Sequence, residues 1–526
     1  MAKAKVAELE TPNALRSFNP RSGDLVAEVE SATPDEVREA VRRAREAQPA
    51  WAARGAEGRA ESLLEMAHRI HARMDDFVDT ISAETGKPRV EALSHDVVPT
   101  LLTIRYLARI GPKALRPQRV GRLIAPVLGF SSTIEWRPFG VVGCISPWNY
   151  PFFLAFISVV PALMAGNAVV LKPSEVTPGT GELMRDVLAT LPEGVAGVVQ
   201  GAGEVGAALV DAPCDKICFV GSTATGRRIA AAAAEHLTPL VMELGGQDAA
   251  IVCDDADLDA ASSGVLWGAF LNAGQTCAAI ERAYVVESVA DRFEERLLSK
   301  LRELEAQPEP QIGPLCISRQ FDTVERHVRD AVDRGATVLA GGPEAARPNE
   351  NGSLWYPPTV IEGRSDQMAI FREETFGPVL PVVRVKDEEE AIRRANEEGY
   401  NLTASVWTTN SSRGRAIGAR VKAGTITIND QAASAGASWG AWGGVGQSGY
   451  GRLHGALGLR EFAVPVHVGT TLMPKVKKAW WYPYDRHTLE TFEAFADLLG
   501  AERLGVRLRA LASVGPKAIR ALRAKI

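Results

Sequence analysis

The chain has 526 residues, of which 46% are apolar and 23% are charged. This composition is typical of an ordinary globular protein, and the length predicts two or three domains rather than a single core. The formal net charge of −5 gives no basic footprint for nucleic acid. No apolar stretch reaches the roughly 20 residues of a transmembrane helix. Because the first residues also lack the apolar run of a signal peptide, we expect a cytoplasmic protein.

The six cysteines are scattered along the chain, which favours a reducing compartment over a disulfide framework. Cys214 and Cys218 stand four residues apart, but no second pair and no nearby histidine completes a metal-ligand set. The eight histidines form no closely spaced pair with an acidic neighbour. We therefore predict no metal site.

Residues 1–113 begin with turn-rich strand signals near residue 20 and then show apolar residues at helical spacing. The predicted helices cover 37–47, 60–74 and 77–83. Residues 119–137 have the pattern of two strands around a Gly-Phe-Ser-Ser turn, which predicts a projecting hairpin.

Strands and helices alternate from residue 138 to residue 245, the pattern of a parallel α/β sheet. The predicted strands are Val141–Ile145, Ala168–Leu171, Val195–Val199, Lys216–Val220 and Leu240–Leu244. A second alternating region runs on to residue 445, and an apolar strand follows at 462–468. The predicted fold class is therefore α/β.

Residues 475–526 differ in composition from the rest of the chain. They carry 11 Lys and Arg against 5 Asp and Glu, so this segment is +6 and the remainder is −11. Leu504, Leu508 and Leu511 share one helical face. We favour an amphipathic helix that packs on the body or on a neighbouring subunit, and attachment to an anionic membrane surface is the alternative.

Cys277 is the most informative single residue because the segment around it is mostly small or polar. Gly274 and Gln275 come just before it, and such a segment leaves the thiol and the backbone N–H groups accessible. Most free cysteines of an intracellular protein only pack, however. The case for a nucleophile therefore depends on partners elsewhere in the chain.

Two such partners follow predicted strands. Glu243 ends an apolar strand just before a Gly-Gly turn, at the carboxyl edge where ligands of open α/β sheets bind. Apolar neighbours would raise its pKa and suit it as a general base. Asn149 lies in a stiff turn with two prolines, where its amide could hold a developing oxyanion. A salt-bridged surface glutamate and an asparagine that only stabilises its own turn remain the alternatives.

Three segments are candidates for binding a dinucleotide. Lys172 and Glu175 could bind ribose hydroxyls, although their spacing also fits a charged loop. The run Gly221-Ser-Thr-Ala-Thr-Gly226 opens a helix whose N–H groups suit phosphate, with a simple N-cap as the alternative. Residues 201–206 match Gly-x-Gly-x-x-Gly but lack the acidic residue expected about 20 positions later. We therefore do not place the pyrophosphate at 201–206.

Taken together, these residues resemble the aldehyde dehydrogenase superfamily over residues 15–470. The motifs in family order are Pro147-Trp-Asn, Lys172-Pro-Ser-Glu, Gly221-Ser-Thr, Glu243-Leu-Gly-Gly, Gly274-Gln-Thr-Cys and Glu374-Thr-Phe-Gly-Pro378. The resemblance implies a Rossmann-like NAD-binding domain, a catalytic α/β domain and a small β oligomerisation arm, in a homodimer or homotetramer. The corresponding boundaries are 1–118 with 138–244, 245–445, and 119–137 with 446–474, followed by the 475–526 extension.

The resemblance also implies a role for each matched residue. Cys277 would be the nucleophile, Asn149 and the Cys277 N–H would hold the oxyanion, and Glu243 would activate the hydrolytic water. Implied cofactor contacts are Ile145, Pro147, Trp148, Lys172, Ser174, Glu175, Gly206, Gly221, Ser222, Leu244, Glu374 and Phe376. A carboxylate at position 175 favours NAD over NADP because it repels a 2′-phosphate, although some family members with this glutamate use both.

The implied reaction oxidises an aldehyde to a carboxylic acid through a thiohemiacetal and a thioester on the cysteine. The sequence departs from the family pattern at Gln247, Gly446 and Leu453, with Trp439 and Trp442 nearby, so the substrate is the least determined part. An aromatic or medium-chain aldehyde is favoured by Phe153, Trp267, Phe270 and Trp439. A succinate-semialdehyde-type dehydrogenase is the alternative, and it would need a basic group such as Arg282 in the channel.

Two rival functions come from other classes. An acyl-transferring enzyme would pass the thioester to coenzyme A, and the water-activating Glu243 argues against it. A catalytically silent or membrane-tethered binding protein would use the basic tail, and the intact set of Cys277, Glu243 and Asn149 argues against it.

Overall fold

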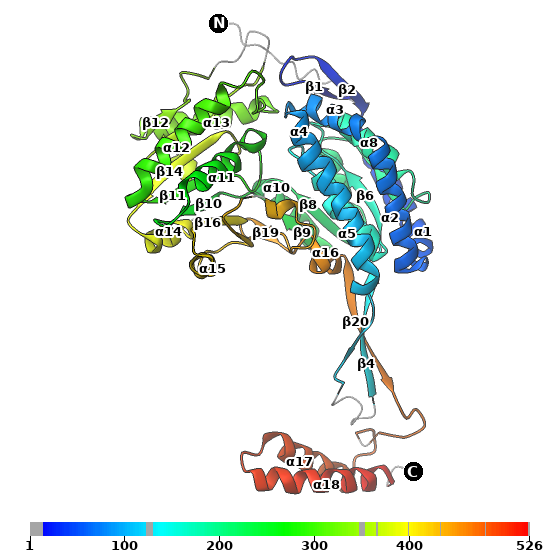
Figure 1. Cartoon of the computed structure of the whole chain (residues 1–526). Helices are drawn as coiled ribbons and strands as arrows, with labels where there is room; N and C mark the ends of the chain where they lie inside the picture. Colours follow the sequence, from blue (N-terminus) through cyan, green and yellow to red (C-terminus); the bar gives the residue numbers. More distant parts are fainter. Residues whose placement is uncertain are drawn as a thin grey trace. The chain divides into compact units, whose positions relative to one another are not determined.

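The computed structural model describes residues 14–122, 130–346, 353–363, 367–397, 399–431, 433–478 and 480–523. They form two compact units. Unit 1 holds the described residues of Met1–Arg116 and Trp136–Val464, and unit 2 holds those of Pro117–Glu135 and Pro465–Ile526. Both predicted α/β domains fall within unit 1 as two sheets (Figure 1). The α/β class is confirmed.

The first sheet has six strands in the order β19-β9-β8-β5-β6-β7, and the pairs from β9 to β7 are parallel. Its strands are β5 (Val141–Ile145), β6 (Ala168–Lys172), β7 (Ala196–Val198), β8 (Lys216–Val220), β9 (Leu240–Glu243) and β19 (Gly449–Tyr450). All five predicted strands are present. β5, β6 and β8 are buried along their whole length, which explains their continuous apolar runs.

Helices cover both faces of this sheet, with a separate apolar cluster on each face. They are α1 (Pro34–Ala53), α2 (Gly55–Ala72), α3 (Met74–Thr85), α4 (Arg89–Ala92), α5 (Val98–Ala114), α7 (Phe153–Ala165), α8 (Pro178–Leu188), α9 (Gly203–Asp211), α10 (Thr223–Glu235) and α16 (Gly455–Glu461), with the π-helix η1 (Leu93–Val97) between α4 and α5. The three predicted helices are confirmed with longer bounds. α7 is apolar on every side because it is completely buried against α2, α5 and the sheet.

The start of α1 shows how local sequence sets these bounds. Thr33 accepts a hydrogen bond from the N–H of Glu36, whose carboxylate accepts one from the N–H of Thr33. This reciprocal capping box begins the helix at Pro34, four residues after a two-stranded hairpin ends. The hairpin consists of β1 (Ala14–Phe18) and β2 (Leu25–Glu30).

The second sheet has seven strands in the order β12-β13-β14-β11-β10-β16-β17, and only β12–β13 is antiparallel. Its strands are β10 (Asp248–Val252), β11 (Ile280–Val286), β12 (Thr337–Ala340), β13 (Thr359–Glu362), β14 (Val379–Val385), β16 (Thr403–Trp407) and β17 (Thr425–Ile428). The remaining elements of unit 1 are α11 (Leu258–Phe270), η2 (Leu271–Gly274), α12 (Glu287–Glu305), α13 (Ser318–Asp333), η3 (Ala369–Phe371), α14 (Glu388–Ala395), β15 (Tyr400–Asn401), α15 (Ser411–Gly418), η4 (Ala433–Gly436) and β18 (Val445–Gly446).

The prediction that residues 446–474 belong to the arm is wrong for residues 446–464, which lie in unit 1. β19 pairs with the end of β9, where Gly449 stands opposite Glu243, and α16 packs on α5 and α7. A Cβ at Gly449 would lie 2.1 Å from the carbonyl oxygen of Met242, so only glycine allows this approach. The glycine-rich loop of residues 443–451 therefore lies beside Glu243 in unit 1.

Unit 2 contains a three-stranded sheet in the order β20-β4-β3 and two helices. Its elements are β3 (Gln118–Val120), β4 (Phe130–Pro138), β20 (Ala463–Thr471), α17 (Arg486–Gly500) and α18 (Leu504–Arg523). The predicted hairpin is present, but its turn was misplaced, because Ser131 and Ser132 lie within β4 and Ser132 pairs with Val120. Gly129, the first residue of that predicted turn, lies outside the described residues.

Among the described residues, no helix combines the length and apolar character needed to cross a membrane. Within the same residues, no group of three or more His, Cys, Asp or Glu is placed to hold a metal ion.

Candidate active site

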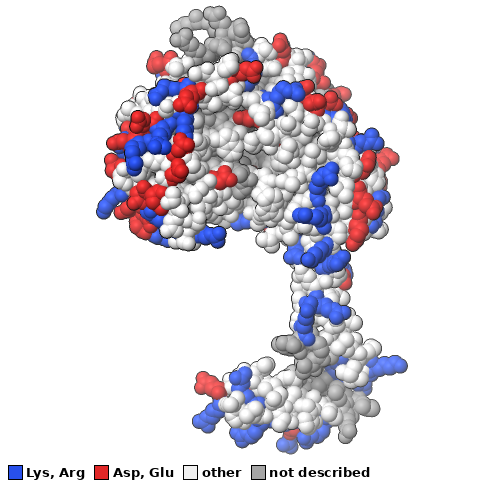
Figure 2. All heavy atoms as spheres, in the orientation of Figure 1, with Lys and Arg blue, Asp and Glu red and all other residues white. Residues whose placement is uncertain are grey.

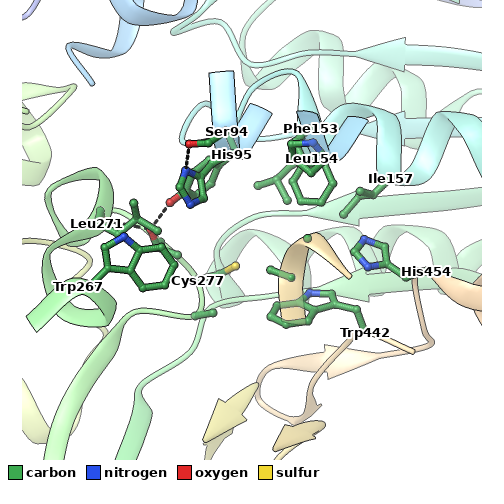
Figure 3. Close-up of a pocket in the computed structure, with 16 residues that line it drawn as sticks. Ser94, His95, Phe153, Leu154, Ile157, Trp267, Leu271, Cys277, Trp442 and His454 are labelled. Carbon is green, nitrogen blue, oxygen red and sulfur yellow. Dashed lines mark hydrogen bonds between the residues drawn. The ribbon is translucent and has the colours of Figure 1, made fainter. Parts of the chain in front are cut away.

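Cys277 lies where two cavities of unit 1 meet. All six cysteines fall within the described residues and are free; five are buried, and Cys277 is partly exposed. The first cavity, of about 230 Å³, is lined mainly by apolar and aromatic side chains (Figure 3). The second, of about 170 Å³, includes Asn149 and Glu243 in its lining. The three residues predicted to carry the chemistry are therefore brought together.

A left-handed turn delivers Cys277 to this position. Asn272, Ala273 and Gly274 have φ angles of 54°, 55° and 70° in succession. Non-glycine residues adopt this conformation at a cost, so the turn persists only because its surroundings fix it. The Asn272 side chain donates to the carbonyls of Asn149 and Gln275 at 3.0 and 3.1 Å. A Cβ at Gly274 would lie 2.1 Å from a backbone oxygen, so this position requires glycine.

The Gly245-Gly246 pair allows the end of β9 to approach the thiol. A Cβ at Gly245 would lie 2.2 Å from a carboxylate oxygen of Glu374, and one at Gly246 would lie 2.3 Å from the carbonyl of Cys277. Both glycines are thus needed for close packing. They set the distance between Glu243 and Cys277.

Glu243 is buried, and burial raises its pKa to about 7, although hydrogen bonds with Cys277 and the Trp442 indole act in the opposite direction. Its Oε1 atom has no partner within the described residues. A carboxylate with a pKa near neutrality and an unpartnered oxygen facing a cavity can accept a proton from a bound molecule.

The same surroundings keep the Cys277 thiol neutral. Burial raises its pKa well above the ordinary value, and the Glu243 carboxylate adds to the effect. Asp248 and Glu374 contribute further negative charge. As the pH rises, Glu243 therefore loses its proton before the Cys277 thiol does.

Asn149 is buried in the loop between β5 and α7. Its side-chain Nδ2 donates to the carbonyl of Gln275 at 3.0 Å. An amide nitrogen carries two hydrogens, so one N–H is left for a ligand in the second cavity, which Asn149 lines. This is the geometry needed to stabilise a developing oxyanion.

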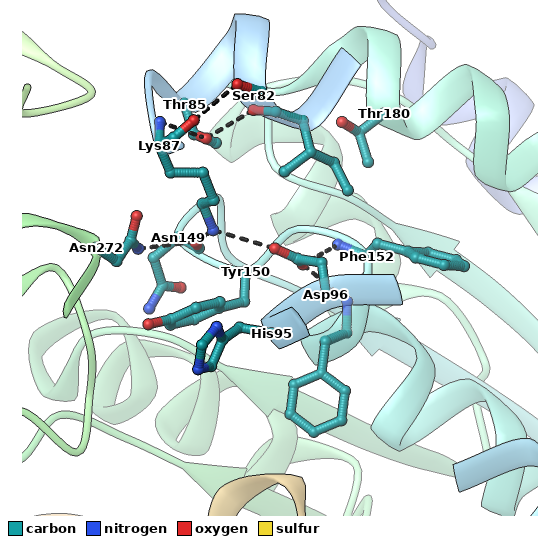
Figure 4. Close-up of polar contacts among 12 residues, drawn as sticks. Ser82, Thr85, Lys87, His95, Asp96, Asn149, Tyr150, Phe152, Thr180 and Asn272 are labelled. Atoms are coloured by element: carbon teal, nitrogen blue, oxygen red, sulfur yellow. Dashed lines mark hydrogen bonds and ion pairs between the residues drawn. The ribbon is translucent and has the colours of Figure 1, made fainter. Parts of the chain in front are cut away.

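A buried ion pair fixes the Asn149 loop, and sequence reasoning did not identify it (Figure 4). The ammonium of Lys87 lies 3.0 Å from Asp96, and both side chains are completely buried. Lys87 also donates to the carbonyl of Asn149 at 2.6 Å and lies 4.2 Å from the centroid of the Tyr150 ring. Asp96 Oδ1 accepts from the backbone N–H groups of Phe152 and Phe153 at 3.2 Å.

Only weak signals could have revealed this pair. Lys87 stands in a Gly-Lys-Pro turn after the last of the three predicted helices, which is also a common surface pattern. Asp96 lies in a π-helix, a distortion that often marks functional sites but leaves no trace in the sequence.

The second cavity collects half of the predicted cofactor residues. Those that line it are Pro147, Trp148, Gly221, Ser222, Glu374 and Phe376. Those that do not are Ile145, Lys172, Ser174, Glu175, Gly206 and Leu244. Arg319 and Gln320 of α13 also line it and were not singled out, because an amphipathic helix offers no sign of which polar residues face a ligand.

Several of these residues have an arrangement that suits a nucleotide-binding site. Ser222 is the N-cap of α10 and accepts from the N–H of Thr225, so the positive end of that helix faces the cavity edge. Trp148 and Phe376 meet edge to face, with ring centroids 5.8 Å apart. The carboxylate of Glu374 accepts from the N–H of Gly246 at 3.1 Å.

Lys172 and Glu175 form an ion pair of 2.8 Å at the carboxyl end of β6. Partial burial acts to raise the pKa of Glu175, but the Lys172 ammonium outweighs it and the pKa is lowered. Glu175 is therefore an exposed, ionised acceptor beside a buried donor.

The first cavity corrects part of the substrate prediction. Phe153 and Trp267 line it. Phe270, in contrast, is buried in the apolar core of the second sheet, and Trp439 is exposed and is not part of the lining. Trp442 and His454 take part instead (Figure 3). Burial lowers the pKa of His454 to about 4, so its ring is neutral.

Arg282 does not reach this cavity. It lies in β11, completely buried, and its guanidinium donates to the carbonyl of Gln247 at 3.1 Å. Among the described residues that line the first cavity there is no Lys or Arg.

Comparison with known proteins places this site in context. Residues 7–468 match the model of the Aldehyde dehydrogenase family. The 4,4′-diapolycopene aldehyde oxidase of a Methylomonas species is 37% identical over 93% of this chain and 92% of its own length. A Mycolicibacterium smegmatis protein, provisionally named as an NADP-dependent succinate-semialdehyde dehydrogenase, is 40% identical over 84% of this chain and 85% of its own length.

Solved structures agree with the sequence matches. The NAD-dependent aldehyde dehydrogenase of Sinorhizobium meliloti has a TM-score of 0.84 and 33% identity, covering 90% of this chain and 94% of that one. PnpE in complex with nicotinamide adenine dinucleotide has a TM-score of 0.83 and 33% identity, covering 90% and 97%.

Removing the buried ion pair is expected to impair turnover of an aldehyde more than its binding. The double variant Lys87→Met/Asp96→Asn leaves no unpaired buried charge, yet it frees the Asn149 loop. We expect kcat to fall about 10- to 100-fold because a misplaced oxyanion donor loses most of its effect. Steady-state kinetics measure this.

Lys216→Met is the matched control, because Lys216 is also buried but lies at the opposite end of β8 from Gly221. Its kcat should remain within about twofold of wild type. Equal losses in both variants, or a loss confined to KM, would contradict a positioning role for Lys87.

Proposed function

The chain belongs to the aldehyde dehydrogenase family, and we propose that it oxidises an apolar aldehyde to the carboxylic acid with NAD as the hydride acceptor. The observation that carries the proposal is the position of Cys277 between an apolar cavity and a mixed one that contains charged and amide side chains. The apolar cavity would hold the aldehyde chain, and the mixed cavity holds Asn149 and Glu243 beside residues predicted to bind the cofactor.

In the proposed reaction, the sulfur of Cys277 adds to the aldehyde carbon and the thiol proton ends on the aldehyde oxygen, which gives a thiohemiacetal. Asn149 and the Cys277 N–H stabilise the negative charge that develops on that oxygen. Loss of hydride from the carbon and of the proton from the oxygen leaves a thioester, and Glu243 then takes a proton from the water that attacks it. One aldehyde, one water and one oxidised cofactor give one acid, one reduced cofactor and one proton.

The cofactor supplies hydride acceptance, and the donor set of the chain fits a dinucleotide. Lys172 and Glu175 offer a donor and an acceptor for ribose hydroxyls, and Ser222 with the start of α10 suits a pyrophosphate. The ionised Glu175 favours NAD by repelling a 2′-phosphate. NADP is a possible second cofactor, since the mycobacterial relative is named for it.

The lining of the first cavity supports an uncharged substrate. A substrate carboxylate buried there would find no cation, and an unpaired buried charge is costly. The name of the Methylomonas relative, which refers to diapolycopene aldehyde, agrees with a hydrocarbon chain. The names of the mycobacterial relatives favour succinate semialdehyde as the second candidate.

We further propose a homodimer or homotetramer. β20 is an edge strand of the sheet in unit 2. Its outer backbone groups can pair with another copy of the chain, as unprotected edge strands do. Light scattering of the full chain tests this.

Replacing the nucleophile is expected to abolish aldehyde oxidation. Cys277→Ser should lower kcat at least about 1,000-fold, because a serine hydroxyl without a strong base is a far weaker nucleophile. NADH formation at 340 nm with an aldehyde panel measures it. Cys253→Ala is the control, since Cys253 is buried in the second core and should stay near wild type. Full activity of Cys277→Ser would refute the proposal.

The substrate proposal predicts a ranking of aldehydes. Benzaldehyde and medium-chain alkanals should show kcat/KM at least about 100-fold above succinate semialdehyde, because one uncompensated buried charge costs several kcal/mol. Initial rates with both NAD and NADP give the comparison. The reverse ranking would favour the succinate-semialdehyde alternative.

Thioester hydrolysis is expected to follow the ionisation of Glu243. A general base acts only when deprotonated, so with a pKa of about 7 the rate should rise with pH and reach half its plateau near neutrality. One pH unit lower, it should be about tenfold below the plateau. The steady phase of p-nitrophenyl acetate hydrolysis, after the acylation burst, reports this step.

Glu243→Gln should keep the burst and lose the steady phase at every pH. An unchanged steady phase would contradict the role of Glu243. If acid forms only when coenzyme A is added, the acyl-transferring rival gains support instead.

A further inference from the structure

Both helices of unit 2 carry an exposed apolar stripe. On α18 the stripe consists of Leu504, Leu508, Leu511 and Ile519, each more than half exposed. These residues recur at helical spacing, and the opposite face of α18 packs on α17 through Ala510. α18 is therefore apolar on two sides, of which α17 covers only one.

The stripe on α17 consists of Leu489, Phe492 and Leu499, whose exposures are 60%, 45% and 78%. They are spaced by three and seven residues and so share a face. The packed side of the same helix includes the buried Thr488, Thr491 and Ala494 and the partly buried Phe495 and Leu498. α17 is thus apolar on two sides, and its exposed side carries large apolar residues that an ordinary packed helix would bury.

The segment between β20 and α17 adds exposed aromatic side chains. Trp480, Trp481, Tyr482 and Tyr484 are all exposed, as are Leu472 and Met473 earlier in the segment. Indole and phenol rings concentrate at membrane–water interfaces, where one end of the ring is apolar and the other is hydrated.

Positive charge surrounds the apolar stripe of α18. Residues 475–526 carry a net charge of +6. Figure 2 shows Lys and Arg spread over the helices of unit 2, with few acidic side chains among them. Arg507 is exposed and lies one helical turn from both Leu504 and Leu511, so cationic and apolar groups alternate on one surface.

We propose that α17, α18 and the aromatic segment 480–484 form a docking surface for an anionic lipid bilayer. Such a bilayer accepts apolar side chains at the acyl boundary and attracts arginine and lysine to its headgroups. A second copy of the same surface would match the leucines but would set α18, whose residues 504–523 include five Lys and Arg and no Asp or Glu, against another cationic helix. The helices would lie in the plane of the interface, since no described helix is apolar enough to cross.

The docking surface acts independently of the chemistry at Cys277. It would bring the chain to the phase in which apolar aldehydes concentrate, and this consequence alone rests on the proposed function. Binding to lipid can therefore be measured without aldehyde or cofactor, so that failure of one proposal is distinguishable from failure of the other.

The test is co-sedimentation of the full chain with phosphatidylcholine vesicles that contain either no phosphatidylglycerol or about a third of it. We expect at least tenfold stronger partitioning onto the anionic vesicles, weakened by high salt because surface charges are screened. Leu508→Glu/Leu511→Glu should lower binding at least tenfold. Arg503→Gln/Arg507→Gln/Arg509→Gln should reduce it to the level seen with phosphatidylcholine alone.

Leu237→Glu is the matched control, because Leu237 is an exposed leucine of unit 1 and its replacement should leave vesicle binding unchanged. All variants should oxidise a water-soluble aldehyde at the wild-type rate, which shows that unit 1 is folded. The proposal is overturned if the chain shows no preference for anionic vesicles or if the leucine variant binds normally. It is also overturned if that variant changes the oligomeric state in light scattering, which would assign the surface to a second copy.

Discussion

The geometry of the candidate site depends on the contacts made by the completely buried ammonium of Lys87. A buried charge is tolerated only when nearly all its donors are used. Here Asp96, the carbonyl of Asn149 and the face of Tyr150 surround it. Asp96 in turn accepts from the backbone at the start of α7. Loss of Asp96 would leave the buried ammonium unpaired, and loss of the Asn149 carbonyl would leave one of its N–H donors unused, so the whole arrangement is held as a unit.

This constraint connects to the strained turn before Cys277. The carbonyl of Asn149 accepts both from Lys87 and from the side chain of Asn272, whose own backbone is left-handed. A single carbonyl oxygen thus links the loop that carries Asn149 to the turn that precedes Cys277. The strain at Asn272 and Ala273 is tolerated because these contacts fix both loops at once.

The electrostatics of the site follow from the same packing. Carboxyl groups at Glu243, Glu281 and Glu374 are buried close to one another, and burial is the main reason that the pKa of each is raised. Burial, together with the negative charge of Glu243, Asp248 and Glu374, also raises the pKa of the Cys277 thiol and keeps it protonated. A site of this kind does not hold a permanently reactive thiolate, and its reactivity depends on what binds beside the sulfur.

Sequence reasoning could predict the strands of the first sheet because buried parallel strands are continuous apolar runs that differ clearly from the helices between them. It also identified Cys277, Glu243 and Asn149, since each follows a strand or a glycine-rich turn. It could not find Lys87 and Asp96, because burial of a charged residue depends on tertiary packing alone. The same limit misplaced Arg282, Phe270 and the 446–464 segment, whose partners are distant in sequence.

The effect of the departure from the family pattern at position 453 depends on contacts that exist only in the folded chain. Leu453 exchanges backbone hydrogen bonds with Trp442 at 2.7 and 2.8 Å, which fixes the indole in the wall of the first cavity. His454 follows directly, and its lowered pKa keeps the ring neutral throughout the physiological range. The Leu453 side chain is itself buried in the core behind this aromatic wall, where the glutamate common in the family would be a buried charge. A substrate that needs a cation gains nothing from such a wall, whereas a hydrocarbon chain gains burial along its length.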